Sequence, residues 1–244
     1  MAEYENRVRS VGATGAVAID EGLRAYMLRV YNYMLMGLAL SGATAWIALN
    51  TPLGALFFAQ TATGFSLSPL GWILFFAPLA LVFFLSFRIE SLSASTARAL
   101  FFVYAALVGA SLSIIFAVYT DASITRVFFI SAAAFGGLSL WGYTTQRDLT
   151  GMGSFLMMGL IGIIIASLVN IFLRSSGLDW IISVIGVIVF AGLTAWDTQK
   201  IKEMYSPMDD GTVAGRKAVM GALSLYLDFI NLFLMLLRLF GDRR

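Results

Sequence analysis

Seven runs of apolar residues, each long enough to cross a bilayer, constrain this chain more than any other feature. A membrane-spanning helix needs about 20 consecutive, mostly apolar residues. The runs cover residues 30–49, 71–87, 97–119, 127–143, 152–173, 179–203 and 213–240. Of the 244 residues, 59% are hydrophobic and only 12% are charged, whereas soluble domains carry about 25% charged residues. The sequence therefore predicts an all-α membrane protein with seven transmembrane helices.

The connections between these runs are too short to hold a separate soluble domain. They cover residues 50–70, 88–96, 120–126, 144–151, 174–178 and 204–212. We expect a cytoplasmic N-terminal segment over residues 1–29, followed by one transmembrane domain over residues 30–244. Acidic and basic residues are mixed in the first 29 residues, which is unlike a cleavable signal peptide.

The distribution of lysine and arginine favours a cytoplasmic N-terminus. With that orientation, eleven of the sixteen basic residues lie in inner segments and five in outer segments, as the positive-inside rule requires. Three of the five outer residues are Arg238, Arg243 and Arg244. A six-span arrangement with a re-entrant last segment would return these three to the cytoplasmic side, and it remains an alternative.

The chain contains no cysteine and no histidine. Disulfides, thiolate or imidazole metal sites, and cysteine or histidine catalysis are therefore excluded. The net charge of +2 is too small to indicate nucleic acid as a partner. We expect no cofactor.

Two aspartates interrupt the apolar runs. Asp197 lies toward the inner end of the sixth run, and Asp228 lies well inside the seventh. A carboxylate in the hydrocarbon region costs several kcal/mol and indicates a functional site by default. The alternatives are an acid at a helix end for Asp197 and a structural hydrogen bond for Asp228.

Polar residues in the seventh run are arranged at alternating steps of four and three, which places them on one stripe of a helix. A helix with one polar stripe and apolar residues elsewhere belongs inside a bundle. The stripe makes Ser224 and Asn231 candidate site residues beside Asp228. Its members are Lys217, Gly221, Ser224, Asp228, Asn231, Met235 and Arg238.

The two aspartates approach the connection that joins their helices from opposite directions. If that connection centres on Asp209, Asp197 stands 12 residues before the centre and Asp228 stands 19 after it. At a rise of 1.5 Å per residue the mismatch is about 10 Å, so contact is allowed but not required. Arg88, at the end of the second run, is also on the inner side; its alternative role is a headgroup anchor.

Four segments resemble the transmembrane Bax inhibitor motif family, and the short N-terminus and compact loops are similar to a bacterial-type member. They cover residues 30–38, 142–153, Asp197-Thr-Gln-Lys-Ile-Lys202 and residues 224–233. The resemblance implies a seven-helix fold with a central last helix, a bacterial inner membrane, and a pH-sensitive calcium leak. The paired aspartates of the family map onto Asp197 and Asp228. Its latching arginine maps onto Arg88, although Arg98 is also nearby.

These observations favour a pH-sensitive calcium (cation) leak channel whose partners are the lipid bilayer, calcium ions and protons. Two nearby carboxylates in a medium of low dielectric constant cannot both ionise cheaply, so we expect them to titrate as one unit. Calcium prefers oxygen ligands, and Asp197 and Asp228 offer transient contacts to it.

Two other classes of protein remain. One is a membrane adaptor that modulates a membrane protease or another membrane protein, as some bacterial relatives are thought to do. The other is an intramembrane aspartyl protease. Those enzymes have a glycine before the catalytic aspartate, whereas here Trp196 and Leu227 precede the two acids. We therefore expect that the protein is not an enzyme.

Overall fold

The computed structural model describes residues 2–52, 54–61 and 64–244. Within them, seven helical segments are long and apolar enough to cross a membrane, which confirms the predicted fold class. The helices that carry these segments are α1 (Ala2–Asn50), α3 (Pro69–Arg88), α4 (Ala94–Ser111), α6 (Asp121–Thr144), α7 (Thr150–Leu173), α8 (Ser176–Glu203) and α9 (Gly211–Phe240). The third segment continues from α4 through α5 (Ile114–Val118).

Most of these helices begin a few residues before the apolar run that predicted them. The reason is an N-cap, a polar side chain that accepts a hydrogen bond from a main-chain N–H of the first turn. Such caps are Ser68 for α3, Ser93 for α4, Thr120 for α6, Ser175 for α8 and Asp210 for α9.

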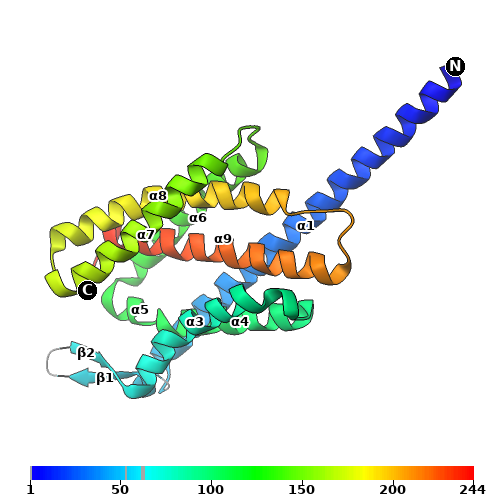
Figure 1. Cartoon of the computed structure of the whole chain (residues 1–244). Coiled ribbons are helices and arrows are strands. Elements are labelled where there is room, and N and C mark those ends of the chain that lie inside the picture. Colours follow the sequence, from blue (N-terminus) through cyan, green and yellow to red (C-terminus); the bar gives the residue numbers. More distant parts are fainter. Residues whose placement is uncertain (1, 53, 62–63) are drawn as a thin grey trace.

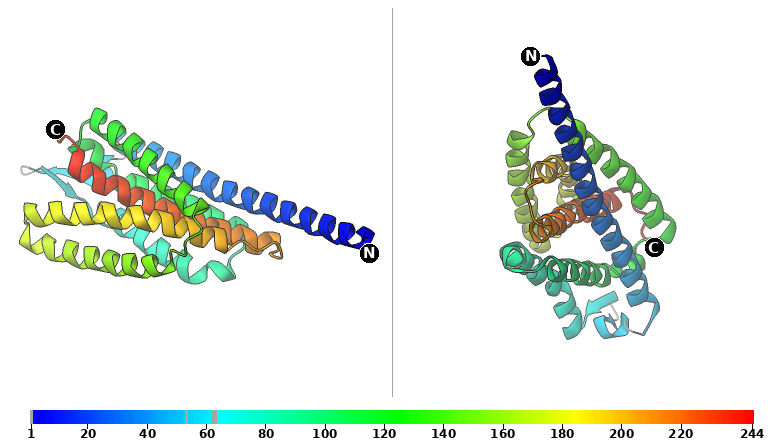
Figure 2. Two further views of the ribbon diagram at one scale, coloured as in Figure 1. Left: turned by 90° about the horizontal axis from the view of Figure 1, so that it is seen from above. Right: turned by 90° about the vertical axis from the view of Figure 1, so that its right-hand side faces the viewer.

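The last helix, α9, is central, as the resemblance implied. It packs against α1, α4, α6 and α8, while α3 lies against α4 and α7 lies against α8 (Figure 2). Over its most apolar window, 61% of α9 is buried inside the protein, compared with 11% for α7. The 30 residues of α9 form one continuous helix of about 45 Å. This length favours a full crossing over a re-entrant segment.

Two regions differ from the simple expectation. Helix α1 runs without interruption from Ala2 to Asn50, so the expected N-terminal segment continues the first span as helix and projects beyond the bundle (Figure 1). The connection after α1 contains a short helix α2 (Gly54–Phe57) and an antiparallel hairpin of β1 (Phe58–Thr61) and β2 (Gly64–Leu67).

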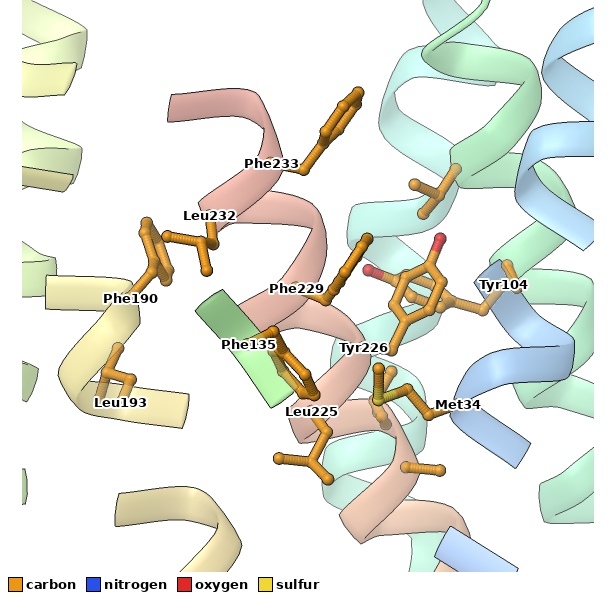
Figure 3. Packing of buried hydrophobic residues seen from close by; sticks show 14 of the residues in the cluster. Met34, Tyr104, Phe135, Phe190, Leu193, Leu225, Tyr226, Phe229, Leu232 and Phe233 are labelled. Atoms are coloured by element: carbon orange, nitrogen blue, oxygen red, sulfur yellow. The ribbon is translucent and has the colours of Figure 1, made fainter. Parts of the chain in front are cut away.

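The core beside α9 is held by aromatic packing and a buried hydrogen bond. Tyr226 is fully buried and packs edge-on against Phe101 and Tyr104, with ring centroids 5.9 and 5.7 Å apart (Figure 3). The Tyr226 hydroxyl lies 2.7 Å from Ser41 Oγ, which donates to the main-chain oxygen of Ala105 at 2.7 Å. Because lipid gives little hydrophobic drive to helix association, these contacts specify how α1, α4 and α9 meet.

Candidate functional site

The polar stripe of α9 faces α8, its antiparallel neighbour. A Cβ added to Gly221 would lie 3.0 Å from the Ile201 side chain, and a Cβ added to Gly186 would lie 2.8 Å from the Met235 side chain. Small residues on each helix therefore admit the larger residue opposite, which brings the two helices close. The contacts along this seam include Gly221 with Ile201, Asp228 with Asp197, Met235 with Gly186, and Arg238 with Asp179.

The two aspartates meet because the helices are staggered. Asp197 lies six residues before the end of α8 at Glu203, and Asp228 lies 17 residues after the start of α9 at Gly211. Helix α9 therefore begins about 16 Å beyond the end of α8, an offset that is visible in Figure 1. The connecting segment 204–210 spans this offset, so the mismatch estimated from the sequence does not separate the carboxyl groups.

The carboxyl groups of Asp197 and Asp228 face each other closely enough for a hydrogen bond between them. Such a bond needs a proton on one of the two groups, because an ionised carboxylate only accepts. The side chain of Asp228 is buried, and within the described chain its Oδ2 atom has no hydrogen-bond partner. Asp197 is only partly buried, and Lys200, one turn further along α8, is the cation that acts on it. The pair thus brings α8 and α9, the two most buried spans, together at one point.

Asn231 and Ser224 flank this pair on the stripe, about one turn to either side of Asp228, and both are half-buried. The amide nitrogen of Asn231 donates to the main-chain oxygen of Leu227 at 2.8 Å. This bond fixes the orientation of the amide, so its oxygen faces away from the helix backbone. Their spacing of three and four residues from Asp228 places both on the same stripe of α9 as Asp228.

Arg88 is not brought to the aspartates. It ends α3 with an exposed side chain, and in the part of the chain that the structure describes it forms no ion pair with an acidic residue. Arg98, in α4, is also exposed and likewise unpaired there. The role of Arg88 as a latch stays a prediction that would require α3 to move.

The turn of α8 that follows Asp197 docks into the connection between α6 and α7. The Gln199 side chain accepts from the main-chain N–H of Leu149 and donates to the main-chain oxygen of Arg147, both at 2.8 Å. The Lys202 ammonium donates to the main-chain oxygen of Tyr143 at 2.9 Å. Two segments that carry the family resemblance, residues 142–153 and 197–202, thus contact each other. Sequence analysis missed Gln199 and Lys202, although three polar residues after Asp197 in an otherwise apolar helix were a visible signal.

A chain of hydroxyl groups ties α8 to α6 and α1 beside Asp197. The Thr198 hydroxyl donates to the main-chain oxygen of Thr194 at 2.7 Å. Ser139 must therefore donate to Thr198 at 2.9 Å, and Tyr31 must donate to Ser139 at 2.6 Å. The chain ends on the main-chain oxygen of Thr194, so each of its three hydroxyl protons is already donated within the chain. It positions α8 and offers no proton path to Asp197.

Removing the first donor of this chain is expected to weaken the bundle. Tyr31→Phe deletes one hydroxyl and leaves Ser139 without its donor, which should cost about 0.5–1.5 kcal/mol. Thermal unfolding in detergent would measure the change. Tyr33→Phe, on the same helix and outside the hydroxyl chain, is the control, and an equal loss in both variants would mean that the chain contributes nothing specific.

Comparison with known proteins agrees with the fold and the motifs. The model of the family described as Bax1-I, inhibitor of apoptosis-promoting Bax1, matches residues 23–244. Protein RP147 of Rickettsia prowazekii is 54% identical over 228 residues, which cover 92% of each chain. Inner membrane protein YbhL of Escherichia coli is 50% identical over 225 residues, covering 91% of this chain and 94% of YbhL. With nearly the whole chain matched by the family and by bacterial relatives, this multi-pass membrane protein belongs to the Bax inhibitor (Bax1-I) family.

Proposed function

We propose that the protein forms a pH-sensitive calcium (cation) leak pathway through the membrane, in which Asp197 and Asp228 sense protons. The observation that carries the proposal is the buried carboxyl pair between α8 and α9. These two helices are the most buried of the seven spans, at 44% and 61%. An ionisable carboxyl group inside a membrane bundle is costly and indicates a functional site by default. No enzymatic activity and no resident cofactor are part of this proposal.

Proton exchange at this pair would change both the local charge and the packing. When the shared proton leaves, two adjacent carboxylates carry like charges in a medium of low dielectric constant and repel each other across the seam. The same negative charge attracts cations. Two carboxylates supply only some of the six to eight oxygen ligands that calcium takes, so calcium would pass with water and neighbouring oxygens rather than remain bound.

The test is calcium flux from liposomes that contain only this protein. A leak that depends on pH supports the proposal. Absence of flux from folded, correctly inserted protein would exclude a channel and would leave an adaptor of a membrane protease or another membrane protein as the better function.

Asn231 is expected to influence this flux because it lies on the seam one turn beyond Asp228. Asn231→Leu removes the polar group that a partly hydrated cation would meet next, and it should lower flux several-fold. Leu232→Met is the matched control, since Leu232 is buried in apolar packing. Flux assays at equal protein density would compare the two variants. Equal effects would show that the seam is not part of the conduction path.

We further propose a cytoplasmic N-terminus in the bacterial inner membrane, the location given in the name of the Escherichia coli relative. The lysine and arginine distribution supports this orientation. The C-terminal arginines that this topology places outside have partners at their own end of the bundle. These contacts are Arg238 with Asp179 at 3.4 Å, Arg244 with Asp121 at 2.8 Å, and Arg243 over the Tyr119 ring at 5.8 Å.

Single cysteines in this cysteine-free chain would test the orientation. Thr61→Cys, in the β1–β2 hairpin, is expected to react with an impermeant thiol reagent from outside the cell. Gly211→Cys, at the start of α9, should react only after the membrane is permeabilised. Labelling of both positions in intact cells would contradict the proposed topology.

A further inference from the structure

A cavity of about 450 Å³ opens at the end of the bundle where α9 begins. Figure 1 shows the start of α9 on the right. It lies between the first turns of α9, the end of α8 and the 3-10 turn η1 (Ile89–Ser91), which joins α3 to α4. Its volume falls within the range of ligand sites, about 300–1,000 Å³. The walls combine apolar side chains with three charged ones: Ile89, Met204, Val213 and Met220, and Glu90, Arg216 and Lys217.

One of the three charges is already neutralised. The Lys217 ammonium lies 2.6 Å from the Asp209 carboxylate, and both side chains are half-buried. The other two differ. Arg216 donates to the main-chain oxygen of Glu90, and neither Arg216 nor the Glu90 carboxylate belongs to an ion pair within the described residues. Most of the five N–H donors of Arg216 therefore remain available. The cavity wall presents one guanidinium and one carboxylate.

The cavity lies at the depth of the lipid headgroups. The α3 span ends and the α9 span begins beside it, so hydrocarbon gives way to the polar region of the bilayer at this level. Basic pockets between spans on the cytoplasmic side take anionic lipid headgroups, and the carboxylate beside the guanidinium in this wall favours a zwitterionic headgroup instead. Phospholipid surrounds the protein at this level. Its acyl chains can pack against the four apolar side chains of the cavity wall.

We propose that this cavity binds a phospholipid with an ethanolamine headgroup. The phosphodiester of such a lipid carries one negative charge, which suits the Arg216 guanidinium. The primary ammonium carries a positive charge and three N–H donors, which suit the Glu90 carboxylate. An anionic lipid without the ammonium would bring like charge against Glu90. A choline headgroup has no N–H to donate. The bound lipid would bridge η1 to α9, the helix that carries Asp228.

Native mass spectrometry of the delipidated, full-length protein in detergent would test this site. Phosphatidylethanolamine is expected to bind at least about tenfold more tightly than phosphatidylcholine or phosphatidylglycerol with the same acyl chains. Arg216→Gln should lower the affinity for phosphatidylethanolamine about tenfold. Glu90→Gln should remove the preference for it over phosphatidylglycerol. Arg98→Gln, a charge removed at the same end of the bundle outside the cavity, should leave the affinity unchanged.

Met220→Trp would fill the cavity and leave its charges in place, so it should also abolish retention of the lipid while the protein still unfolds cooperatively. Equal affinities for the three lipids, or an equal loss in Arg98→Gln and Arg216→Gln, would overturn the proposal. Competition by soluble phosphoethanolamine as strong as by the lipid would also overturn it, because the ligand would then come from water rather than from the bilayer.

Discussion

Asp197→Asn and Asp228→Asn are each expected to flatten the pH dependence of calcium flux in liposomes. The wild-type dependence should reflect exchange of the proton that the two carboxyl groups share, because two adjacent carboxylates in a medium of low dielectric constant cannot both ionise cheaply. Either substitution replaces one member of the pair with a neutral group of nearly the same shape. The remaining aspartate then has no second carboxyl group with which to share a proton.

The double variant should resemble the single variants rather than sum them, because the two groups titrate as one unit. Asp148→Asn is the matched control. Hydrogen bonds from the side chain and the main chain of Thr150 hold the pKa of Asp148 below its usual range, so this exposed carboxylate stays ionised throughout the assay. If both single variants fold and keep the wild-type pH profile, these aspartates are not the proton sensor, and the adaptor function gains support.

Gly142→Ala is expected to destabilise the protein strongly. A Cβ at Gly142 would lie 2.2 Å from the main-chain oxygen of Ala195. Because this oxygen belongs to the backbone of α8, it cannot rotate away, and the two helices must separate. Overpacking of this kind costs about 1–3 kcal/mol. Asp197 lies two residues further along α8, so separation of the two helices would also displace Asp197. Calcium flux should therefore fall together with the stability.

Gly137→Ala, in the same helix, provides the control. No atom lies within 4 Å of a Cβ added there, and alanine favours a helix over glycine by about 1 kcal/mol, so this variant should be neutral or slightly more stable. Unfolding followed by tryptophan fluorescence would compare the two, since Trp196 lies on α8 beside Ala195. Equal melting temperatures would show that α6 and α8 do not approach as closely as described.

The seven spans could be predicted from the sequence because the backbone N–H and C=O groups of a segment in lipid must be hydrogen-bonded within the protein. A helix meets this requirement within a single apolar run. Their starts were less accurate, since the caps are polar residues such as Ser93 and Thr120, which hydropathy assigns to the loops. The hairpin of β1 and β2 was missed. Its strands are only four residues each, too short for an alternating pattern to stand out.

The candidate site could be predicted in part. The periodicity of α9 identified its inward face, and the cost of a carboxylate in lipid identified Asp197 and Asp228. Their contact could not be derived, because helix lengths alone do not reveal the stagger between α8 and α9. The partners of Gln199 and Lys202 belong to a different helix pair, so no local pattern pointed to them.

The stagger also makes the segment 204–210 a tether of limited length. The eight Cα-to-Cα steps from Glu203 to Gly211 reach at most about 27 Å. They must cover an axial offset of about 16 Å and the separation of two packed helices, about 9 Å. The direct distance is therefore about 18 Å, and three fewer residues would reduce the reach to about 17 Å. A tether shortened by three residues could therefore no longer let Asp228 stand opposite Asp197, whatever its composition.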